Sequence, residues 1–380
     1  MLFHVPTRIV FGSGAVAQVK AEAERAGGDD RPLIVTDKGL IAAGVADKVL
    51  SQFPRALVFD EVEANPKHTT VNRAGELARE AKPRLVIGLG GGSSLDAAKA
   101  VALLAANPGG IEDYEGREKY ATPPLPLLAV PTTCGTGSEV TWVSVITHTG
   151  RMFKMSIKGP AMYPVTAVVD PDLLRSLPGP LVASTGMDAL THAVEAYTVK
   201  PANSITDIFA RDAVRLILSS ITGAFSDIKG NVEARERLML GSLIAGLAFG
   251  NSDVGAVHCL AESVGSMFDT PHGVANAVFL PQVMEFNLPA VAGKYADLAR
   301  LAGIDDEDER RAAQKLVGRV KDLTRQLGIP SFRSLNIPES AFPEIAEKSF
   351  RNNSNPSNPK DLGPADYLGI LHRAASEKNP

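Results

Sequence analysis

The sequence predicts an α/β N-terminal half built on a mainly parallel sheet, followed by an all-α C-terminal half. Two observations carry this prediction. Short β-branched runs alternate with helical patterns through the first half, which is typical of βαβ units. After Pro178-Gly179-Pro180 the strand signals stop, and apolar residues recur at helical spacing. Because 380 residues exceed the usual size of one core, we expect two domains, residues 1–180 and residues 181–380.

In the first half of the chain, the predicted strands and helices alternate. Five short strands are predicted at Arg8–Phe11, Leu33–Thr36, Ala56–Phe59, Leu85–Leu89 and Leu127–Val130. Helical patterns between them cover Gly39–Gln52, Thr69–Ala81 and Ser93–Ala106. A hairpin then joins Val143–Thr147 to Met152–Ile157, and a last strand covers Ala167–Val169. In the helical half, the polar segment 352–359 is predicted to be a surface loop.

Composition and charge exclude several classes of protein. The net charge of −4 offers no basic surface for nucleic acid and no polybasic patch for anionic lipid. No apolar run is long enough to span a bilayer, and the first residues do not form a signal peptide. The two cysteines cannot form a disulfide framework. We therefore expect a cytoplasmic protein that binds neither nucleic acid nor membrane.

A glycine turn between a strand and a helix is the first candidate binding site. Gly90-Gly91-Gly92-Ser93-Ser94 follows the strand Leu85–Leu89 and opens a helix. Glycines let the backbone approach a pyrophosphate, and the amides of a helix start bind anions. The spacing differs from the standard G-x-G-x-x-G pattern, so a simple tight turn with Ser93 as the N-cap is the alternative.

Two other segments favour a nucleotide site at the same sheet. Asp37 follows the strand Leu33–Thr36, where a carboxylate can accept hydrogen bonds from an adenosine ribose. Its alternative role is the N-cap of the next helix. The segment Pro131–Glu139 follows another apolar strand and supplies several hydroxyls and glycines. Since ligands of open α/β sheets bind at the carboxyl ends of the strands, these segments predict one site.

The helical half contains a candidate set of metal ligands. Asp188 and His192 lie one turn apart on a predicted helix, and His258 and His272 follow later in the chain. Three imidazoles and one carboxylate suit Zn²⁺ or Fe²⁺. Each residue also has a simpler interpretation: Asp188 in the first turn of its helix, His192 as a core histidine and His272 as a loop cap. The sequence alone does not bring the four side chains together.

At these motifs the chain resembles the iron-containing (group III) alcohol dehydrogenase family, and the likeness runs essentially from end to end. Gly90–Lys99 resembles the pyrophosphate loop of the family, and Pro131–Thr141 resembles its second nucleotide segment. Thr185–Tyr197 resembles the first metal signature, whereas Ala245–His258 and Pro271–Pro281 resemble the second. The resemblance implies a Rossmann-like domain followed by an all-α domain, in a dehydroquinate synthase-like architecture with both ligands in the cleft between the domains.

The resemblance also implies an activity and assigns residues to it. It implies an NAD(H)-dependent alcohol dehydrogenase or aldehyde reductase, in which hydride passes between a metal-bound alkoxide and C4 of the nicotinamide. The metal ligands would be Asp188, His192, His258 and His272, on Fe²⁺ or Zn²⁺. The cofactor contacts would be Asp37, Gly91, Gly92, Ser93, Asp96, Thr132, Thr133, Ser138 and Lys154, with Asp37 favouring NAD over NADP. Phe249 and Val254 would line the pocket for an alcohol or aldehyde, and His272 and Glu262 would take part in catalysis. We also expect a homodimer or a larger homo-oligomer.

One position departs from the family. Many members carry a further histidine four residues after the third ligand, often assigned to proton relay, and this chain has Glu262 there. The alternatives within the superfamily are a glycerol-dehydrogenase-like enzyme, a maleylacetate-reductase-like enzyme or a lyase of the dehydroquinate synthase type. A metal- or nucleotide-binding protein without turnover is the alternative from another class. Complete nucleotide and metal motifs in one chain favour the dehydrogenase.

Overall fold

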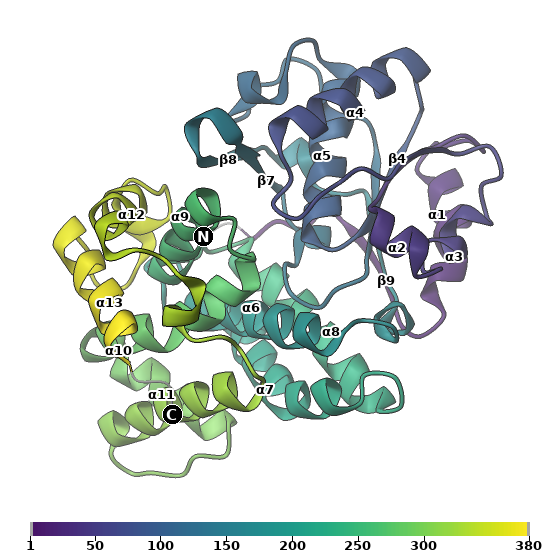
Figure 1. Cartoon of the computed structure of the whole chain (residues 1–380). Coiled ribbons are helices and arrows are strands. Elements are labelled where there is room, and N and C mark those ends of the chain that lie inside the picture. The colour runs from purple at the N-terminus through teal and green to yellow at the C-terminus, as the bar shows by residue number, and fades with distance from the viewer. Residues whose placement is uncertain (1–2, 378–380) are drawn as a thin grey trace. The chain divides into compact units, whose positions relative to one another are not determined.

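The computed structural model describes residues 3–377, which form two compact units (Figure 1). One unit contains His4–Leu177, and the other contains Phe3 and the helices that follow from Pro178 onward. The α/β half and the helical half predicted from the sequence are confirmed. The break lies just before the first long helix, where Pro178 is the N-cap.

A six-stranded parallel sheet forms the centre of the first unit. Its strand order is β1-β9-β6-β4-β2-β3. The strands are β1 (Arg8–Phe11), β2 (Leu33–Val35), β3 (Leu57–Phe59), β4 (Val86–Gly90), β6 (Leu127–Pro131) and β9 (Thr166–Val169). β4 is buried along its whole length, as expected for a strand of a parallel sheet with both faces covered.

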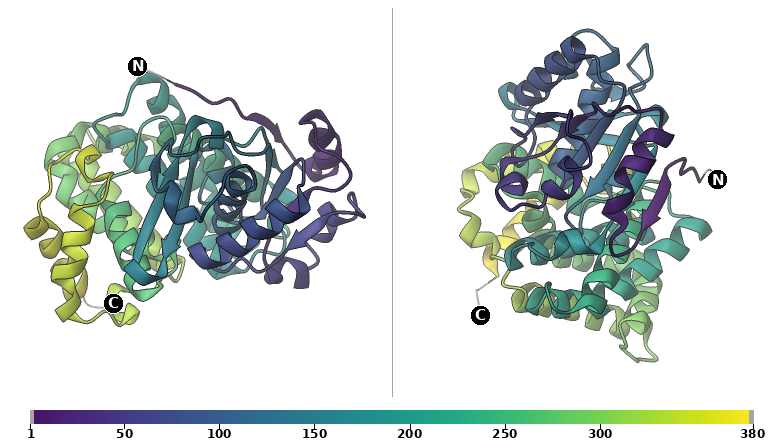
Figure 2. Two further views of the ribbon diagram at one scale, coloured as in Figure 1. Left: turned by 90° about the horizontal axis from the view of Figure 1, so that it is seen from above. Right: turned by 90° about the vertical axis from the view of Figure 1, so that its right-hand side faces the viewer.

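Helices cover both faces of this sheet (Figure 2). They are α1 (Val19–Arg25), α2 (Lys38–Ala42), α3 (Asp47–Leu50), α4 (His68–Ala81) and α5 (Gly92–Ala106). Along β2, Leu33 and Val35 pack into the core that contains α4 and α5, whereas Ile34 packs into the core that contains α1 and α3. The period-two alternation of side chains therefore divides one apolar strand between two cores.

The remaining strands form a small second sheet. β7 (Val143–His148) and β8 (Phe153–Lys158) pair as the predicted antiparallel hairpin, and β5 (Gly116–Arg117) pairs with β8. The single helix expected over Gly39–Gln52 is wrong, because the chain forms α2 and α3 instead. Gly44, between them, has φ of +67°, which interrupts a right-handed helix.

The second unit consists of helices. They are α6 (Gly179–Thr198), α7 (Ser204–Ser226), α8 (Val232–Phe249), α9 (Ala256–Phe268), α10 (His272–Leu301), α11 (Glu309–Gln326), α12 (Phe342–Phe350) and α13 (Pro364–Ser376). α6 is the central helix: every residue from Met187 to Thr198 is buried. It packs against α7, α8 and α10. Among the described residues, no helix is long and apolar enough to cross a membrane.

Candidate functional site

The glycine turn after β4 leads directly into α5, as the sequence predicts. Gly90 has φ of +149°, and Gly91 is the N-cap of the helix. Ser93 is the second helical residue, so the interpretation of Ser93 as the N-cap is wrong. A Cβ atom on Gly92 would lie 2.4 Å from Cγ2 of Thr136. Because the N-cap has no side chain, it accepts no hydrogen bond from the amides at the start of α5, and amides of this kind can bind an anion.

The two candidate nucleotide segments lie side by side. β4 and β6 are neighbours, and the amide of Thr132 donates a hydrogen bond to the carbonyl of Gly90 at 2.9 Å. The Thr133 side chain faces Gly91, where an added Cβ would lie 3.1 Å from its Cγ2. Both segments therefore meet at the carboxyl edge of the sheet, where ligands of this fold class bind.

Asp37 lies at the same edge, after β2. Its Oδ1 accepts a hydrogen bond from the Leu40 amide at 3.0 Å, which makes it the N-cap of α2. Its Oδ2 accepts from Ser94 Oγ at 3.4 Å. The carboxylate thus caps one helix and contacts the first turn of α5. The N-cap role does not exclude a ribose contact, since a carboxylate has about four acceptor sites.

A buried polar network joins the two nucleotide segments. Ser138 Oγ donates to Asp96 at 2.6 Å and accepts from Lys99 Nζ at 2.8 Å. Asp96 also accepts from the Val145 amide at 3.0 Å. Burial lowers the pKa of Lys99 to about 8. The sequence analysis missed Lys99, although it is part of the glycine motif, because a lysine in a helix normally reaches solvent.

Lys154, another expected cofactor contact, lies on β8. Its Nζ donates a hydrogen bond to Oδ1 of Asn65 at 2.9 Å. The side chain is 9% exposed, and the Asn65 backbone adopts a left-handed conformation with φ of 51°. The ammonium group is therefore held at a fixed place within the first unit.

The candidate metal ligands of the second unit come from three helices. Asp188 is the tenth residue of α6, so it does not serve the first turn of that helix. His258 is the third residue of α9, and His272 is the first residue of α10. One donor atom from each of these three residues lies within 4.8 Å of the others. Asp188 and His258 are buried, and the His272 side chain is 28% exposed.

The donor set fits a cation. Asn276 Nδ2 donates to Asp188 Oδ1 at 2.6 Å and lies 3.3 Å from His258 Nε2 and 3.2 Å from His272 Nε2. The partly positive amide group therefore lies among three acceptor atoms, where a metal ion would satisfy them better. Asn276 Oδ1 is buried and makes no hydrogen bond with any described residue. Burial alone would raise the pKa of Asp188, but the neighbouring histidines outweigh it and hold that pKa below its ordinary value.

His192 lies beside this cluster on α6. Its ring centroid is 4.5 Å from that of His258, and it stacks on Phe249 at 4.2 Å. It is not one of the three residues whose donor atoms lie within 4.8 Å of one another. Phe249, the last residue of α8, thus packs against the histidine that the sequence assigns as a fourth ligand. Val254, the other expected pocket residue, is half-buried in the loop after α8.

Glu195 is a candidate site residue that the sequence analysis missed. Its Oε2 accepts a hydrogen bond from His258 Nδ1 at 2.5 Å, and both side chains are buried. This bond places the ring proton on Nδ1 and leaves the Nε2 lone pair for a metal. Burial lowers the pKa of His258, but the Glu195 carboxylate outweighs it and raises that pKa above its ordinary value. Glu195 lies three residues after His192, so helical spacing was an available signal.

Glu262 lies one turn after His258 on α9, as expected. Its Oε2 accepts a hydrogen bond from Asn352 Nδ2 at 2.6 Å. The segment 352–359 is not the surface loop that its composition predicts, because Asn355, Ser357 and Asn358 are buried. These polar side chains are buried because they bond to other helices and to the loop before α9.

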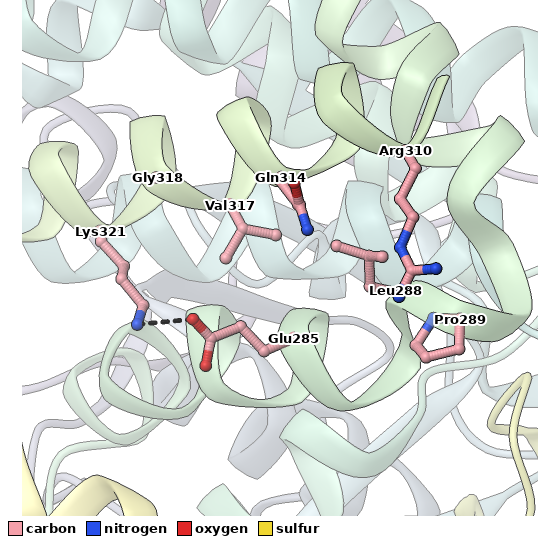
Figure 3. A pocket seen from close by; sticks show the side chains of 8 residues that line it. All are labelled: Glu285, Leu288, Pro289, Arg310, Gln314, Val317, Gly318 and Lys321. Atoms are coloured by element: carbon pink, nitrogen blue, oxygen red, sulfur yellow. Dashed lines mark ion pairs between the residues drawn. The ribbon is translucent and has the colours of Figure 1, made fainter. Parts of the chain in front are cut away.

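A shallow groove of about 360 Å³ lies between α10 and α11 (Figure 3). Leu288 and Val317 are aliphatic side chains that line it, and Lys321 pairs with Glu285 at one end, 2.7 Å apart. Glu285 is thirteen residues after His272 on α10, which is about 20 Å along a helix. The groove is therefore separate from the metal ligands.

Comparison with known proteins agrees with this geometry. The family described as "Iron-containing alcohol dehydrogenase" matches residues 6–171. The family described as "Fe-containing alcohol dehydrogenase family, C-terminal" matches residues 182–375. The chain is 40% identical over 379 residues to the 1,3-propanediol dehydrogenase of Citrobacter freundii, covering 97% of both chains.

Solved structures extend the likeness to the fold. A crystal structure of 1,3-propanediol oxidoreductase matches with a TM-score of 0.94 and 38% identity, covering 98% of this chain and all of the other. Sulfoacetaldehyde reductase from Bifidobacterium kashiwanohense, in complex with NAD⁺, matches with a TM-score of 0.89 and 31% identity over the full length of both chains. The chain belongs to the iron-containing alcohol dehydrogenase family and is a metal- and NAD(H)-dependent oxidoreductase of alcohols or aldehydes.

Proposed function

We propose that this oxidoreductase interconverts short alcohols or diols with the corresponding aldehydes. The first unit binds NAD(H), and the second unit binds the metal and the substrate. The observation that carries the proposal is the set of Asp188, His258 and His272, of which the first two are buried, with His258 oriented by Glu195. The likeness to a 1,3-propanediol dehydrogenase supports a small substrate with one or two hydroxyl groups.

The metal-binding roles follow from the donor atoms. Asp188, His258 and His272 hold one divalent ion, Fe²⁺ or Zn²⁺, and His192 is the fourth ligand, as its ring beside His258 supports. When bound, the ion supplies Lewis-acid polarisation of the substrate oxygen. The ion would replace Asn276 Nδ2 among the acceptor atoms of Asp188, His258 and His272. Glu195 keeps the Nε2 lone pair of His258 available for the ion.

The substrate lies near the side chains that surround His192. The Phe249 ring stacks on His192, and Val254 is half-buried in the loop before α9. Both side chains are apolar, and we propose that they contact the carbon chain of the substrate and exclude water from the reacting carbon.

The cofactor roles follow from the edge of the parallel sheet. The backbone of Gly91 and Gly92, with Ser93, binds the pyrophosphate at the start of α5. Thr132, Thr133 and Ser138 lie on the neighbouring segment, and they contact the cofactor together with Asp96 and Lys154. Asp37 accepts from the adenosine ribose and repels a 2′-phosphate, so NAD is preferred to NADP.

Removal of one metal ligand tests the function. His272→Ala is expected to lose bound metal and turnover while NADH binding stays near that of the wild type, because the cofactor residues lie in the other unit. His372→Ala is the matched control, since His372 packs against Phe342 on α12, away from the ligand set. Metal analysis, NADH fluorescence titration and NADH absorbance with alcohols, diols and aldehydes provide the readouts. A His272→Ala protein with full metal content and activity contradicts the assignment.

We also propose that Glu262 receives the alcohol proton in place of the relay histidine of the family. The Asn352 amide bonds to one carboxylate oxygen of Glu262, and the carboxylate retains other acceptor sites. Proton transfer of this kind is worth about 10²–10⁴-fold in rate. Glu262→Gln, at equal metal content, is expected to slow alcohol oxidation and change its pH profile, and Glu262→His to restore part of the rate. A Gln variant with an unchanged pH profile limits Glu262 to a structural role.

A further inference from the structure

The start of α9 determines where His258 lies. His258 is the third residue of this helix, within the first turn. The N-cap is Gly255, which has no side chain to accept hydrogen bonds from the first amides. A buried helix start requires acceptors for these amides, so other parts of the chain must supply them.

Two side chains from distant segments cap α9. Asn358 Oδ1 accepts a hydrogen bond from the Ala256 amide at 3.2 Å. Glu195 Oε1 accepts from the Val257 amide at 2.8 Å, and the other oxygen of Glu195 holds His258. A Cβ atom on Gly255 would lie 3.0 Å from both capping oxygens. Because Gly255 has no side chain, both capping residues can reach the start of the helix.

Asn358 is itself held rigidly. Its side chain is 1% exposed. Asn287 on α10 exchanges two hydrogen bonds with it, at 3.0 Å and 2.8 Å, and Asn358 Nδ2 also donates to the Lys360 carbonyl at 2.7 Å. Two donors and two acceptor positions are all used, so the orientation of the amide is fixed by its partners.

Other residues of the same segment hold α9 on both sides of its start. We call residues 352–358 the clasp. Ser354 and Ser357 donate to the Asp253 carboxylate, at 3.0 Å and 2.6 Å, in the loop before α9. Asn352 donates to Glu262, one turn after His258. The clasp therefore contacts the chain before, at and after the first turn of α9.

We propose that Asn358 is a positioning residue for metal binding, acting through the first turn of α9. This inference rests on the proposed role of His258 as a metal ligand. Asn358 fixes the Ala256 amide, the adjacent Val257 amide is fixed by Glu195, and Glu195 in turn orients the His258 ring. Without the Asn358 oxygen, the first turn loses one of its two caps. The helix start then shifts relative to α6, and the His258 Nε2 atom moves away from Asp188.

The test compares Asn358→Ala with Asn355→Ala. Asn355 belongs to the clasp and is buried, but its Oδ1 accepts from Tyr367 rather than from the start of α9. Both variants lose a buried amide, so similar losses of thermal stability are expected. Co²⁺ titration of the metal-free protein gives the metal affinity, and the visible spectrum of bound Co²⁺ reports its coordination. Asn358→Ala is expected to bind Co²⁺ about 10–100-fold more weakly and with an altered spectrum, whereas Asn355→Ala binds as the wild type does.

A second variant keeps the test decisive if Asn358→Ala does not fold. Gly255→Ala leaves Asn358 in place but sets a methyl group against both caps, so its Co²⁺ affinity is also expected to fall. The inference is overturned if Asn358→Ala, or Gly255→Ala in its place, binds Co²⁺ within twofold of Asn355→Ala and with the same spectrum. If wild type does not bind Co²⁺, or His272→Ala binds it equally well, the proposed metal site itself fails.

Discussion

Replacement of Glu195 by glutamine isolates the effect of one hydrogen bond on the metal site. Glu195 accepts from the Val257 amide through Oε1 and from His258 Nδ1 through Oε2. A backbone amide can only donate, so the oxygen of the new glutamine must remain on Val257. The NH₂ group of the glutamine then faces His258 Nδ1. The ring must accept there, which moves its proton to Nε2, the atom aimed at Asp188 and His272.

The expected loss of metal affinity follows from the position of the His258 ring proton. A metal ion can bind His258 only if the proton returns to Nδ1, where it would face the glutamine NH₂ group. Both side chains are buried, so two donors would then face each other without water. A buried donor without a partner costs about 1–3 kcal/mol. That range corresponds to a loss of metal affinity of about 5- to 150-fold.

Calorimetric titration of the metal-free protein with Zn²⁺ or Co²⁺ measures the change. Glu139→Gln is the matched control, because Glu139 is a buried glutamate of the other unit and receives the same substitution. We expect Glu195→Gln to lose affinity while the control keeps it. A Glu195→Gln protein that binds metal within twofold of the wild type would refute the tautomer argument.

Three other predictions concern the first unit. Asp37→Gly is expected to raise the ratio of kcat/KM with NADP to that with NAD, because it removes a negative charge beside the position of a 2′-phosphate; an unchanged ratio contradicts the role of Asp37. Gly92→Ala is expected to weaken NADH binding by about 1–3 kcal/mol, because its Cβ would lie 2.4 Å from Cγ2 of Thr136. Adding Thr136→Ser removes that methyl group and is expected to restore part of the affinity in a fluorescence titration. Burial raises the pKa of Glu139 from 4.5 to about 7, so the folded state keeps its proton to higher pH than the unfolded state does. Its contribution to stability is therefore complete below about pH 4.5 and is lost as the pH rises through 7, at a cost of about 2–3 kcal/mol between pH 5 and pH 8. Between pH 5 and pH 8, Glu139→Gln is expected to lose less free energy of unfolding than the wild type, as measured by urea unfolding. An equal loss in the two proteins would contradict the role of Glu139 in this pH dependence.

The nucleotide edge was predictable because its residues follow buried strands directly. The carboxyl ends of parallel neighbours lie at one edge, so Asp37, Gly91 and Thr132 converge once the strand order is known. The sequence contains local signals for each strand and for the glycine turn. It contains a weaker signal for the break at Gly44, because one glycine in a helical pattern does not distinguish a turn from a tolerated residue.

The candidate metal ligands were predictable only in part. Helical spacing places Asp188 and His192 on one face of α6 and also places Glu195 there, although the sequence analysis gave that residue no role. Asn276 is different. It lies one turn after His272 on α10, but its contact with Asp188 joins residues 88 positions apart. No local pattern in the sequence encodes a contact of that separation.

The clasp shows why composition misled at residues 352–358. Asparagine and serine side chains are usually exposed, since burial without partners costs free energy. Here each buried side chain finds a specific partner: Asn358 caps α9, Ser357 bonds to Asp253 and Asn355 bonds to Tyr367. Polarity is then the reason for burial, because only polar atoms can satisfy the unpaired amides and carboxylates of neighbouring elements. A segment rich in asparagine and serine can therefore be a surface loop or can support a buried helix start. The two cases differ in whether neighbouring elements have buried polar groups that need a hydrogen-bond partner. In this chain the group that needs a partner is the first amide of the helix that carries His258, and Asn358 is its acceptor.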